Sequence, residues 1–82
     1  MSAAVAQLSR KQIEDAIALF KLNTEVFPNA FNAYDSLAEA YAAHGDRDLG
    51  IANYRRSLAL NPGNSNASDA LPRLKLPKPQ PR

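Results

Sequence analysis

The sequence predicts an all-α fold, and two observations support this expectation. Alanine and leucine, which favour helices, contribute 15 and 10 of the 82 residues, whereas Val, Ile and Thr together contribute only six. Apolar residues also recur every three or four positions in three separate stretches, which is the spacing of one face of a helix. Large residues (Tyr34 and Tyr41) and small ones (Ala38 and Gly50) can interleave, as the packing of antiparallel helix-turn-helix pairs requires.

The first long helix is expected over about residues 11–27, and Pro28 closes it because proline cannot continue a helix. Residues 2–9 are long enough for two turns of a further helix before it. The apolar stripe of the longer helix consists of Ile13, Ala16, Ile17, Phe20, Thr24 and Phe27.

Two helices follow over about residues 30–43 and 47–60, and the turn between them carries stop and start signals. Gly45 suits the left-handed conformation that commonly ends a helix, and Asp46 is a residue type that caps the next one. The stripe of the first helix consists of Tyr34, Leu37, Ala38 and Tyr41, and that of the second of Gly50, Ile51, Tyr54, Ser57 and Leu58.

A short last helix is expected over residues 65–71, with Ser65 as its cap and Pro72 as its limit. Residues 76–82 alternate proline with other residues and are expected to form a mobile, basic tail. Residues 1–71 carry six basic and eight acidic side chains, whereas residues 72–82 carry four basic side chains and no acidic one. The helical part is therefore mildly acidic, which argues against a nucleic-acid partner.

The chain repeats itself at a constant offset, which aligns Ile17 with Ile51 and Pro28 with Pro62. A helix-turn-helix unit with this period, about 34 residues, resembles the tetratricopeptide repeat (TPR). The resemblance is best over residues 31–64, where Tyr34, Leu37, Ala38, Tyr41, Gly45, Ile51, Tyr54, Leu58 and Pro62 stand at the signature positions of that family.

The resemblance implies about one and two-thirds repeats. A partial first repeat spans residues 1–29, a complete one 30–63, a short capping helix 64–75 and a disordered basic tail 76–82. Such arrays usually need about three or more repeats for stability. We therefore expect a homo-oligomer, in which a second copy completes the missing helix. The apolar ends that would meet lie near the truncated first helix and near Leu71 and Leu74.

Residues 22–41 are also similar to the repeat at the C-terminal end of some bacterial serine hydrolases of the beta-lactamase-like class. The catalytic motifs Ser-x-x-Lys, Gly-x-Ser-x-Gly and His-Glu-x-x-His do not occur in the sequence. Cysteine is also absent, and His44, the one histidine, reads as a solvated or capping residue at the predicted turn. We therefore expect no enzymatic activity, no cofactor and no metal site.

One face of the predicted helix over 30–43 is a candidate partner-binding surface. The resemblance implies this role, because the first helix of each TPR unit lines the concave face; an ordinary solvated helix face is the alternative. Its two acidic residues argue against a clamp for a C-terminal carboxylate and favour a basic or amine-bearing partner. The candidate residues are Asn32, Asp35, Glu39, Ala42 and Ala43.

The sequence thus favours a non-catalytic protein–protein interaction module of TPR type that binds a protein or peptide. Two alternatives stay open: a self-associating structural unit, and a C-terminal TPR appendage of a serine hydrolase whose catalytic domain is absent. No apolar run reaches the about 18 residues that a membrane span needs. Residues 1–10 lack the basic start and apolar core of a signal peptide, so a cytoplasmic location is expected.

Overall fold

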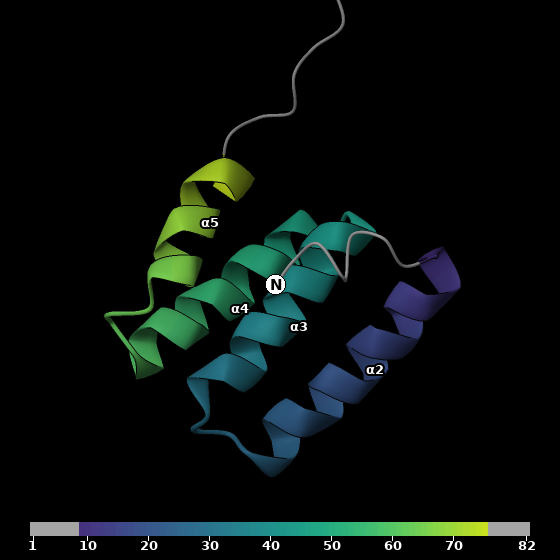
Figure 1. Ribbon diagram of the computed structural model, residues 1–82, viewed down its shortest axis with the longest axis horizontal. Helices are drawn as coiled ribbons and strands as arrows, with labels where there is room; N and C mark the ends of the chain where they lie inside the picture. Colours follow the sequence, from purple (N-terminus) through teal and green to yellow (C-terminus); the bar gives the residue numbers. More distant parts are fainter. Residues whose placement is uncertain (1–8, 76–82) are drawn as a thin grey trace, which may run out of the picture.

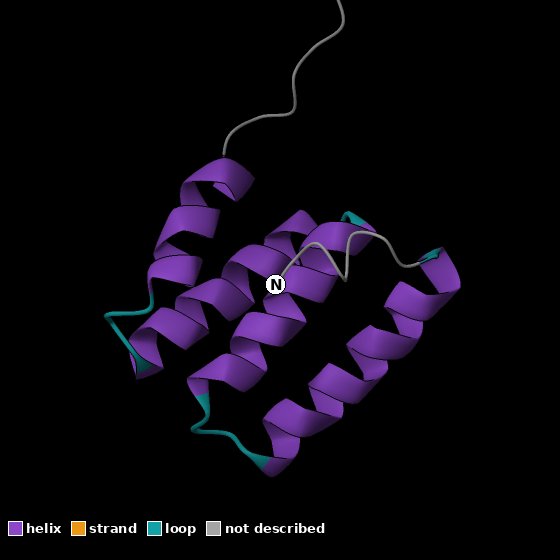
Figure 2. Ribbon diagram, in the orientation of Figure 1, coloured by secondary structure: helices purple, strands orange, loops and turns teal. Residues whose placement is uncertain are grey.

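The computed structural model describes residues 9–75 as four α-helices and no strand (Figure 1, Figure 2). The helices are α2 (Arg10–Val26), α3 (Phe31–His44), α4 (Arg47–Leu60) and α5 (Ser65–Lys75). Each runs antiparallel to the one before it, and they lie in a row in sequence order (Figure 1). The all-α prediction is confirmed. The predicted tail over 76–82, and all but Ser9 of the predicted helix over 2–9, lie outside the described residues.

None of the helices in the described range combines the length and apolar character needed to cross a membrane.

The start of α2 is fixed by a reciprocal cap that the sequence analysis did not identify. The Gln12 backbone N–H donates to Ser9 Oγ (3.2 Å), and the Ser9 backbone N–H donates to Gln12 Oε1 (2.9 Å). Each side chain satisfies a donor that the first turn of a helix would otherwise leave free. The Ser-x-x-Gln pattern is visible in the sequence and is the signal that would have placed Ser9 before the helix.

The turn between α3 and α4 follows the prediction at Gly45 and departs from it at Asp46. Gly45 adopts a left-handed conformation with φ of 94°, and its N–H bonds the last turn of α3. Asp46 precedes α4, but its side chain makes no capping hydrogen bond, because the carboxylate is bound to His44 instead. The acidic charge in the first turn of α4 comes from Asp48, where it interacts favourably with the positive end of the helix dipole.

The core lies where α3, α4 and α5 meet, and small residues bring α3 and α4 together. A Cβ placed on Gly50 would lie 3.3 Å from the Ala38 carbonyl oxygen and 3.4 Å from Leu74 Cδ1. Ala38 itself is fully buried. Small residues at both positions therefore allow the close approach of α3 and α4. The core cluster consists of Ala38, Tyr54, Ala67 and Leu71, with Ile51, Leu58, Ala70 and Leu74 packed against it.

Helix α3 has a second line of buried side chains, besides those of the predicted stripe. Ala33 and Ala40 are both buried, and with Leu37 and His44 they follow helical spacing along one side of α3. His44 on this row contacts Glu14 of α2, so the row faces α2. The predicted stripe of α2 was wrong at its end: Phe27 lies beyond the helix and is mostly exposed.

The loops after α2 and α4 have matching backbone hydrogen bonds at the offset that aligns Pro28 with Pro62. After α2, the Phe27 N–H donates to Asn23 O (2.9 Å) and the Ala30 N–H to Phe27 O (3.1 Å). After α4, the Asn61 N–H donates to Ser57 O (2.9 Å) and the Asn64 N–H to Asn61 O (3.0 Å). The two loops thus share this pair of backbone hydrogen bonds.

The last helix is longer than residues 65–71, because it continues through Pro72 to Lys75. Proline removes one backbone donor in this helix without ending it. The Leu74 carbonyl at the end of α5 accepts a hydrogen bond from Arg47 Nε (2.5 Å), so α4 helps to satisfy the last turn. Ser65 is the first residue of the helix rather than the residue before it.

We expect Leu37→Ala to lower the free energy of unfolding by about 2–5 kcal/mol, because this residue is only 3% exposed. Leu49→Ala is the matched control, since the same side chain is 49% exposed there. The control is expected to change the free energy by less than about 0.5 kcal/mol. Urea unfolding followed by circular dichroism measures both, and equal losses would contradict the assigned core.

Candidate functional site

Three of the five predicted partner-binding residues line a common cavity between α3 and α5. Glu39, Ala42 and Ala43 form its α3 wall. The cavity measures about 290 Å³, which is enough to receive one side chain of a ligand. Its other lining residues come from α4 and α5: Tyr54, Asn66, Ala70, Arg73 and Leu74.

The other two predicted residues are not part of this lining. Asn32 is exposed in the first turn of α3. The Asp35 carboxylate accepts hydrogen bonds from Asn64 Nδ2 (3.2 Å) and from Asn66 Nδ2 (2.6 Å). Asn64 Nδ2 also donates to Ser57 Oγ (2.8 Å), a fully buried group of α4. Asp35 therefore holds α5 and its preceding loop in place and positions Asn66 beside the cavity.

Tyr54 also belongs to this site, although the sequence analysis placed it only on the apolar stripe of its helix. It is only 4% exposed, yet it lines the cavity. The Tyr54 hydroxyl forms no hydrogen bond within residues 9–75. Every buried polar side-chain atom in this range has a hydrogen-bond partner, so the Tyr54 hydroxyl is not itself buried and must reach the solvent of the cavity. Burial, with Glu39 and Asp35 nearby, raises the pKa of Tyr54 to about 12. The phenol is therefore neutral and can both donate and accept a hydrogen bond.

The cavity has charges of both signs, whereas the sequence pointed to an acidic face. Glu39 stands on its α3 wall and Arg73 on its α5 wall. Arg73 Nε donates a long hydrogen bond (3.4 Å) to the Asp69 carbonyl one turn earlier in α5. The remaining lining is mostly apolar, so the cavity combines a small apolar surface with four polar side chains. No group of three or more metal-binding side chains gathers anywhere in residues 9–75.

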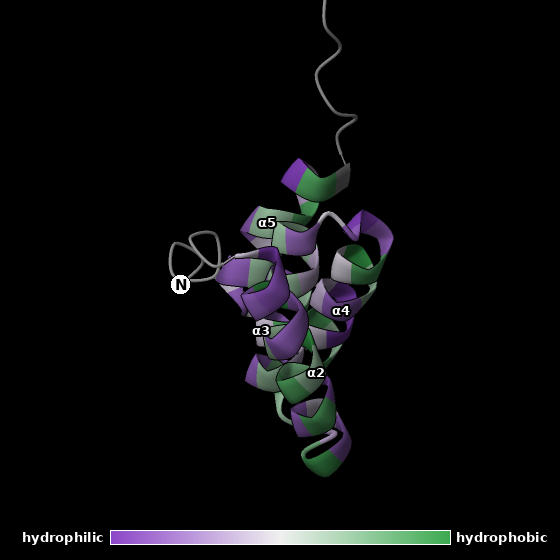
Figure 3. Cartoon of the chain, turned by 90° about the vertical axis from the view of Figure 1, so that its right-hand side faces the viewer, coloured by the Kyte–Doolittle hydropathy of each residue, from purple (hydrophilic) through white to green (hydrophobic). Residues whose placement is uncertain are grey.

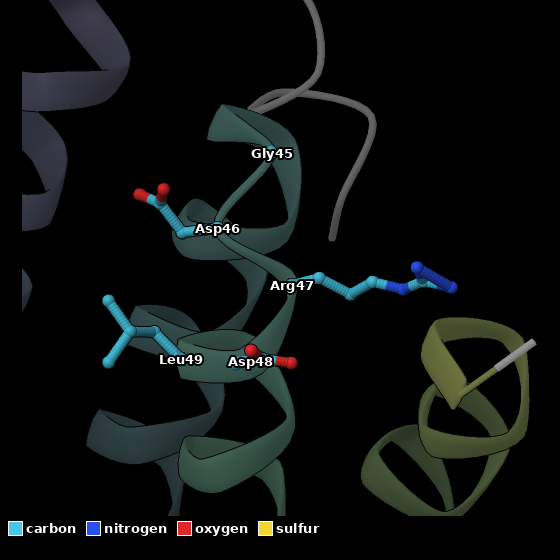
Figure 4. A pocket seen from close by; sticks show the side chains of 5 residues that line it. All are labelled: Gly45, Asp46, Arg47, Asp48 and Leu49. Carbon is cyan, nitrogen blue, oxygen red and sulfur yellow. The ribbon is translucent and has the colours of Figure 1, made fainter. Parts of the chain in front are cut away.

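A larger hollow of about 470 Å³ lies at the turn between α3 and α4 (Figure 4). All five of its lining residues, Gly45 to Leu49, belong to that turn or to the start of α4. Arg47 points across it towards α5, whereas Asp46 and Leu49 point to the other side (Figure 4). Because Arg47 is already engaged at the end of α5, this hollow is less suited to a ligand than the cavity between two helices.

His44 links the turn to α2, and this corrects its interpretation as a solvated or capping residue. Its Nδ1 lies 2.8 Å from Asp46 Oδ2, and its Nε2 lies 3.1 Å from Glu14 Oε2. Carboxylates only accept hydrogen bonds, so both contacts are satisfied when the ring carries two protons. The hydrogen bond to Glu14, followed by that to Asp46, raises the pKa of His44 above its ordinary value of 6.5.

Tyr34 and Arg56 form a contact that the sequence analysis did not predict. The Arg56 guanidinium lies 5.5 Å from the centre of the Tyr34 ring, and the Tyr34 hydroxyl donates to the Pro28 carbonyl (2.9 Å). Arg56 thus packs on an aromatic face rather than only facing solvent.

Comparison of the chain with protein-family models, with curated proteins and with solved structures gave no match.

We expect the His44 ring to titrate above pH 6.5, and Glu14→Gln to lower that pKa towards 6.5 by removing the largest cause of the shift. NMR measures this directly, because His44 is the one histidine of the chain. A wild-type pKa at or below 6.5, or one that Glu14→Gln leaves unchanged, would contradict the bridge.

The same shift predicts how stability depends on pH. The His44 ring binds its proton more tightly in the folded state than in the unfolded state. Its contribution to the free energy of unfolding is therefore complete below pH 6.5 and is lost as the pH rises through the pKa of His44 in the folded state. Chemical unfolding of the wild type over this range is expected to show that loss, and His44→Gln is expected to remove the pH dependence.

Proposed function

We propose that the chain is a non-catalytic protein–protein interaction module built from TPR-type repeats, which binds a peptide segment of a partner in the cavity between α3 and α5. The observation that carries this proposal is the cavity itself. Two helices of the row form its walls, and α4 between them contributes Tyr54. Glu39, Ala42 and Ala43, which the sequence analysis named, line this cavity. The other lining residues reach it only because α4 and α5 pack against α3.

The repeat character is supported by agreement between sequence and geometry at one offset. Nine residues match the TPR signature, and the loops after α2 and α4 share their backbone hydrogen bonds at the offset that aligns Pro28 with Pro62. The same offset separates the first residues of α3 and α5, Phe31 and Ser65. In TPR arrays the first helices of successive units face a ligand side by side, and the proposal assigns α3 and α5 to those positions.

The chemistry of the lining favours a peptide over a highly charged ligand. Ala42, Ala43 and Ala70 leave room for one apolar side chain of a partner. The Tyr54 hydroxyl and the Asn66 side chain are placed to meet backbone groups of the same peptide. Glu39 and Arg73 carry opposite charges, so the cavity by itself does not select a basic partner.

The remaining parts of the proposal follow the sequence. We infer that the partner is neither a nucleic acid nor a membrane, because residues 1–71 have more acidic than basic side chains. A cytoplasmic location stays a prediction. We likewise infer that the chain works without a cofactor.

Blocking the cavity is expected to abolish peptide binding without unfolding the chain. Peptides would first be selected from a random display library against the full chain and then measured by calorimetry. Ala43→Trp fills the cavity from an exposed position and should weaken binding by at least about tenfold, or about 1.4 kcal/mol. Ala59→Trp, at an exposed position of α4 outside the cavity, is the matched control. Equal binding by both variants, or a library that yields no binding peptide, would contradict the proposal.

Tyr54→Phe is expected to separate binding from stability. The hydroxyl has no hydrogen-bond partner within the described residues, so its removal should change the free energy of unfolding by less than about 0.5 kcal/mol. Binding of the selected peptides should weaken by about 0.5–1.5 kcal/mol, the usual contribution of one neutral hydrogen bond. Unfolding curves and calorimetry on the same preparation measure the two effects. Unchanged affinity would remove Tyr54 from the site.

A further inference from the structure

Helix α2 lies outside the core cluster of the fold. It forms one edge of the helix row, the edge that faces the viewer in Figure 3, and it packs mainly against α3. Its buried residues are Ile13 and Thr24, whereas the core cluster and the residues packed against it come from α3, α4 and α5. Leu71 and Leu74, which the sequence analysis expected at an exposed apolar end, belong to that core or pack against it. Release of α2 therefore leaves the core in place.

One side-chain hydrogen bond joins α2 to the rest of the described fold. His44 Nε2, at the end of α3, lies 3.1 Å from Glu14 Oε2 of α2. Within residues 9–75, the other side-chain hydrogen bonds and ion pairs of α2 stay inside that helix or reach its cap, Ser9. The His44 side chain is only 16% exposed, so water screens this contact little. The attachment of α2 therefore depends on the state of one histidine.

The His44 ring needs two protons to satisfy both of its neighbours. Nδ1 lies 2.8 Å from Asp46 Oδ2, and Nε2 faces Glu14. A carboxylate accepts hydrogen bonds and donates none, so each contact requires an N–H on the ring. A neutral imidazole has one N–H and a lone pair on its other nitrogen. When the ring is neutral, one of the two carboxylates faces that lone pair and loses its hydrogen bond.

Glu14 is the carboxylate that a neutral ring releases. Asp46 is two residues from His44 in the same turn, so keeping that contact orders little additional chain. Glu14 belongs to another helix, and its side chain is 48% exposed, so it returns to water at little cost. Arg10 Nε, one turn earlier in α2, lies 3.8 Å from the same oxygen and offers it another partner. The charged groups that act on the ring are thus Glu14 and Arg10 of α2 and Asp46 of the turn.

We propose that the contact between His44 and Glu14 is a proton-dependent latch, which holds α2 on α3 while the ring is charged and lets α2 open locally when the ring is neutral. The raised pKa of His44 fits this arrangement, because the folded state favours the doubly protonated ring. The latch does not rest on the proposed function, because α2 contributes no residue to the lining of the cavity between α3 and α5.

The direction of the pH dependence follows from the proton. With α2 closed, both carboxylates hold the charged ring, whereas with α2 open only Asp46 remains beside it. The closed form therefore binds the proton more tightly. The opening constant, which is the ratio of open to closed molecules, is low at acidic pH and rises as the pH passes through the pKa of His44 in the closed form. Because one proton is released, the rise is at most about tenfold per pH unit.

Amide hydrogen exchange of the full chain, measured by NMR between about pH 6 and pH 9, tests the proposal. The measured rates are divided by the intrinsic exchange rates, which gives an opening constant for each amide. The amides of Ile13 and Ile17 in α2 should have opening constants at least about tenfold larger than that of Tyr54 in α4, since α2 opens without the core. The opening constants of the α2 amides should also rise with pH as described above.

Replacing Glu14 should remove the pH dependence of this opening. Glu14→Ala deletes the partner of His44, so the opening constant of α2 should stay near the high value of the wild type at every pH. Asp15→Ala is the matched control, because the Asp15 carboxylate pairs with Lys11 inside α2 (3.0 Å). This control should keep the pH dependence of the wild type. Circular dichroism should show that both variants stay helical.

Asp46→Asn tests the role of the second carboxylate. The asparagine amide can donate to Nδ1, and the single N–H of a neutral ring then stays on Nε2 for Glu14. In this variant α2 should stay closed at high pH, so its opening constant should rise less than in the wild type. The two variants thus move the opening constant at high pH in different ways, although each removes one carboxylate beside the same ring.

Opening constants of the α2 amides that equal those of α4 would overturn the proposal, because α2 would then leave only when the whole chain unfolds. An opening constant of α2 that does not change with pH would overturn it too, as would an equal effect of Glu14→Ala and Asp15→Ala on that dependence. Peptide binding is measured separately with the Ala43→Trp variant, so failure of the latch and failure of the proposed function are distinguishable.

Discussion

The close approach of α3 and α4 at Gly50 is the constraint on which the other contacts depend. A side chain at this position would press on the Ala38 carbonyl of α3 and on Leu74 of α5. Gly50 therefore sets the distance of α4 from both neighbours on that side. Because α4 lies this close to α3 and α5, Tyr54 is enclosed by the core and still lines the cavity between α3 and α5. The candidate site is thus a consequence of small residues at a helix crossing.

A polar network then fixes how α5 sits beside α3. Asp35 accepts from the side-chain amides of both Asn64 and Asn66, and Asn64 also reaches the buried Ser57. A buried asparagine has to find such partners, because an unpaired polar group in the core is costly. The network joins three helices through their side chains, whereas apolar packing alone leaves the rotation of α5 less defined. Asp35 therefore contributes to the site by positioning Asn66, and it does so without lining the cavity.

The two edges of the helix row have different properties. At one edge, α5 covers the core with Leu71 and Leu74 and exposes mostly polar residues. At the other edge, α2 packs against α3 with one side and leaves leucines exposed on the other. His44 holds α2 to the turn between α3 and α4 through Glu14, so the attachment of this edge includes a titrating contact. The two edges of the row therefore differ both in the polarity of their exposed side chains and in the contacts that hold them to the core.

Local physics determined much of what the sequence predicted correctly. The ends of α4, the left-handed Gly45 and the small residues Ala38 and Gly50 follow from spacing, turn chemistry and size, which depend on neighbouring residues. Tertiary structure alone decided which residues share the cavity, because Arg73 and Asn66 reach it only once α5 has docked on α4. It also decided that Asp35 is engaged by two amides from the far end of the chain, those of Asn64 and Asn66. Tertiary structure also provides a partner for the last turn of α5, where Arg47, distant in the sequence, donates to the Leu74 carbonyl. Such contacts join residues far apart in the chain, and the pattern of any one helix does not encode them.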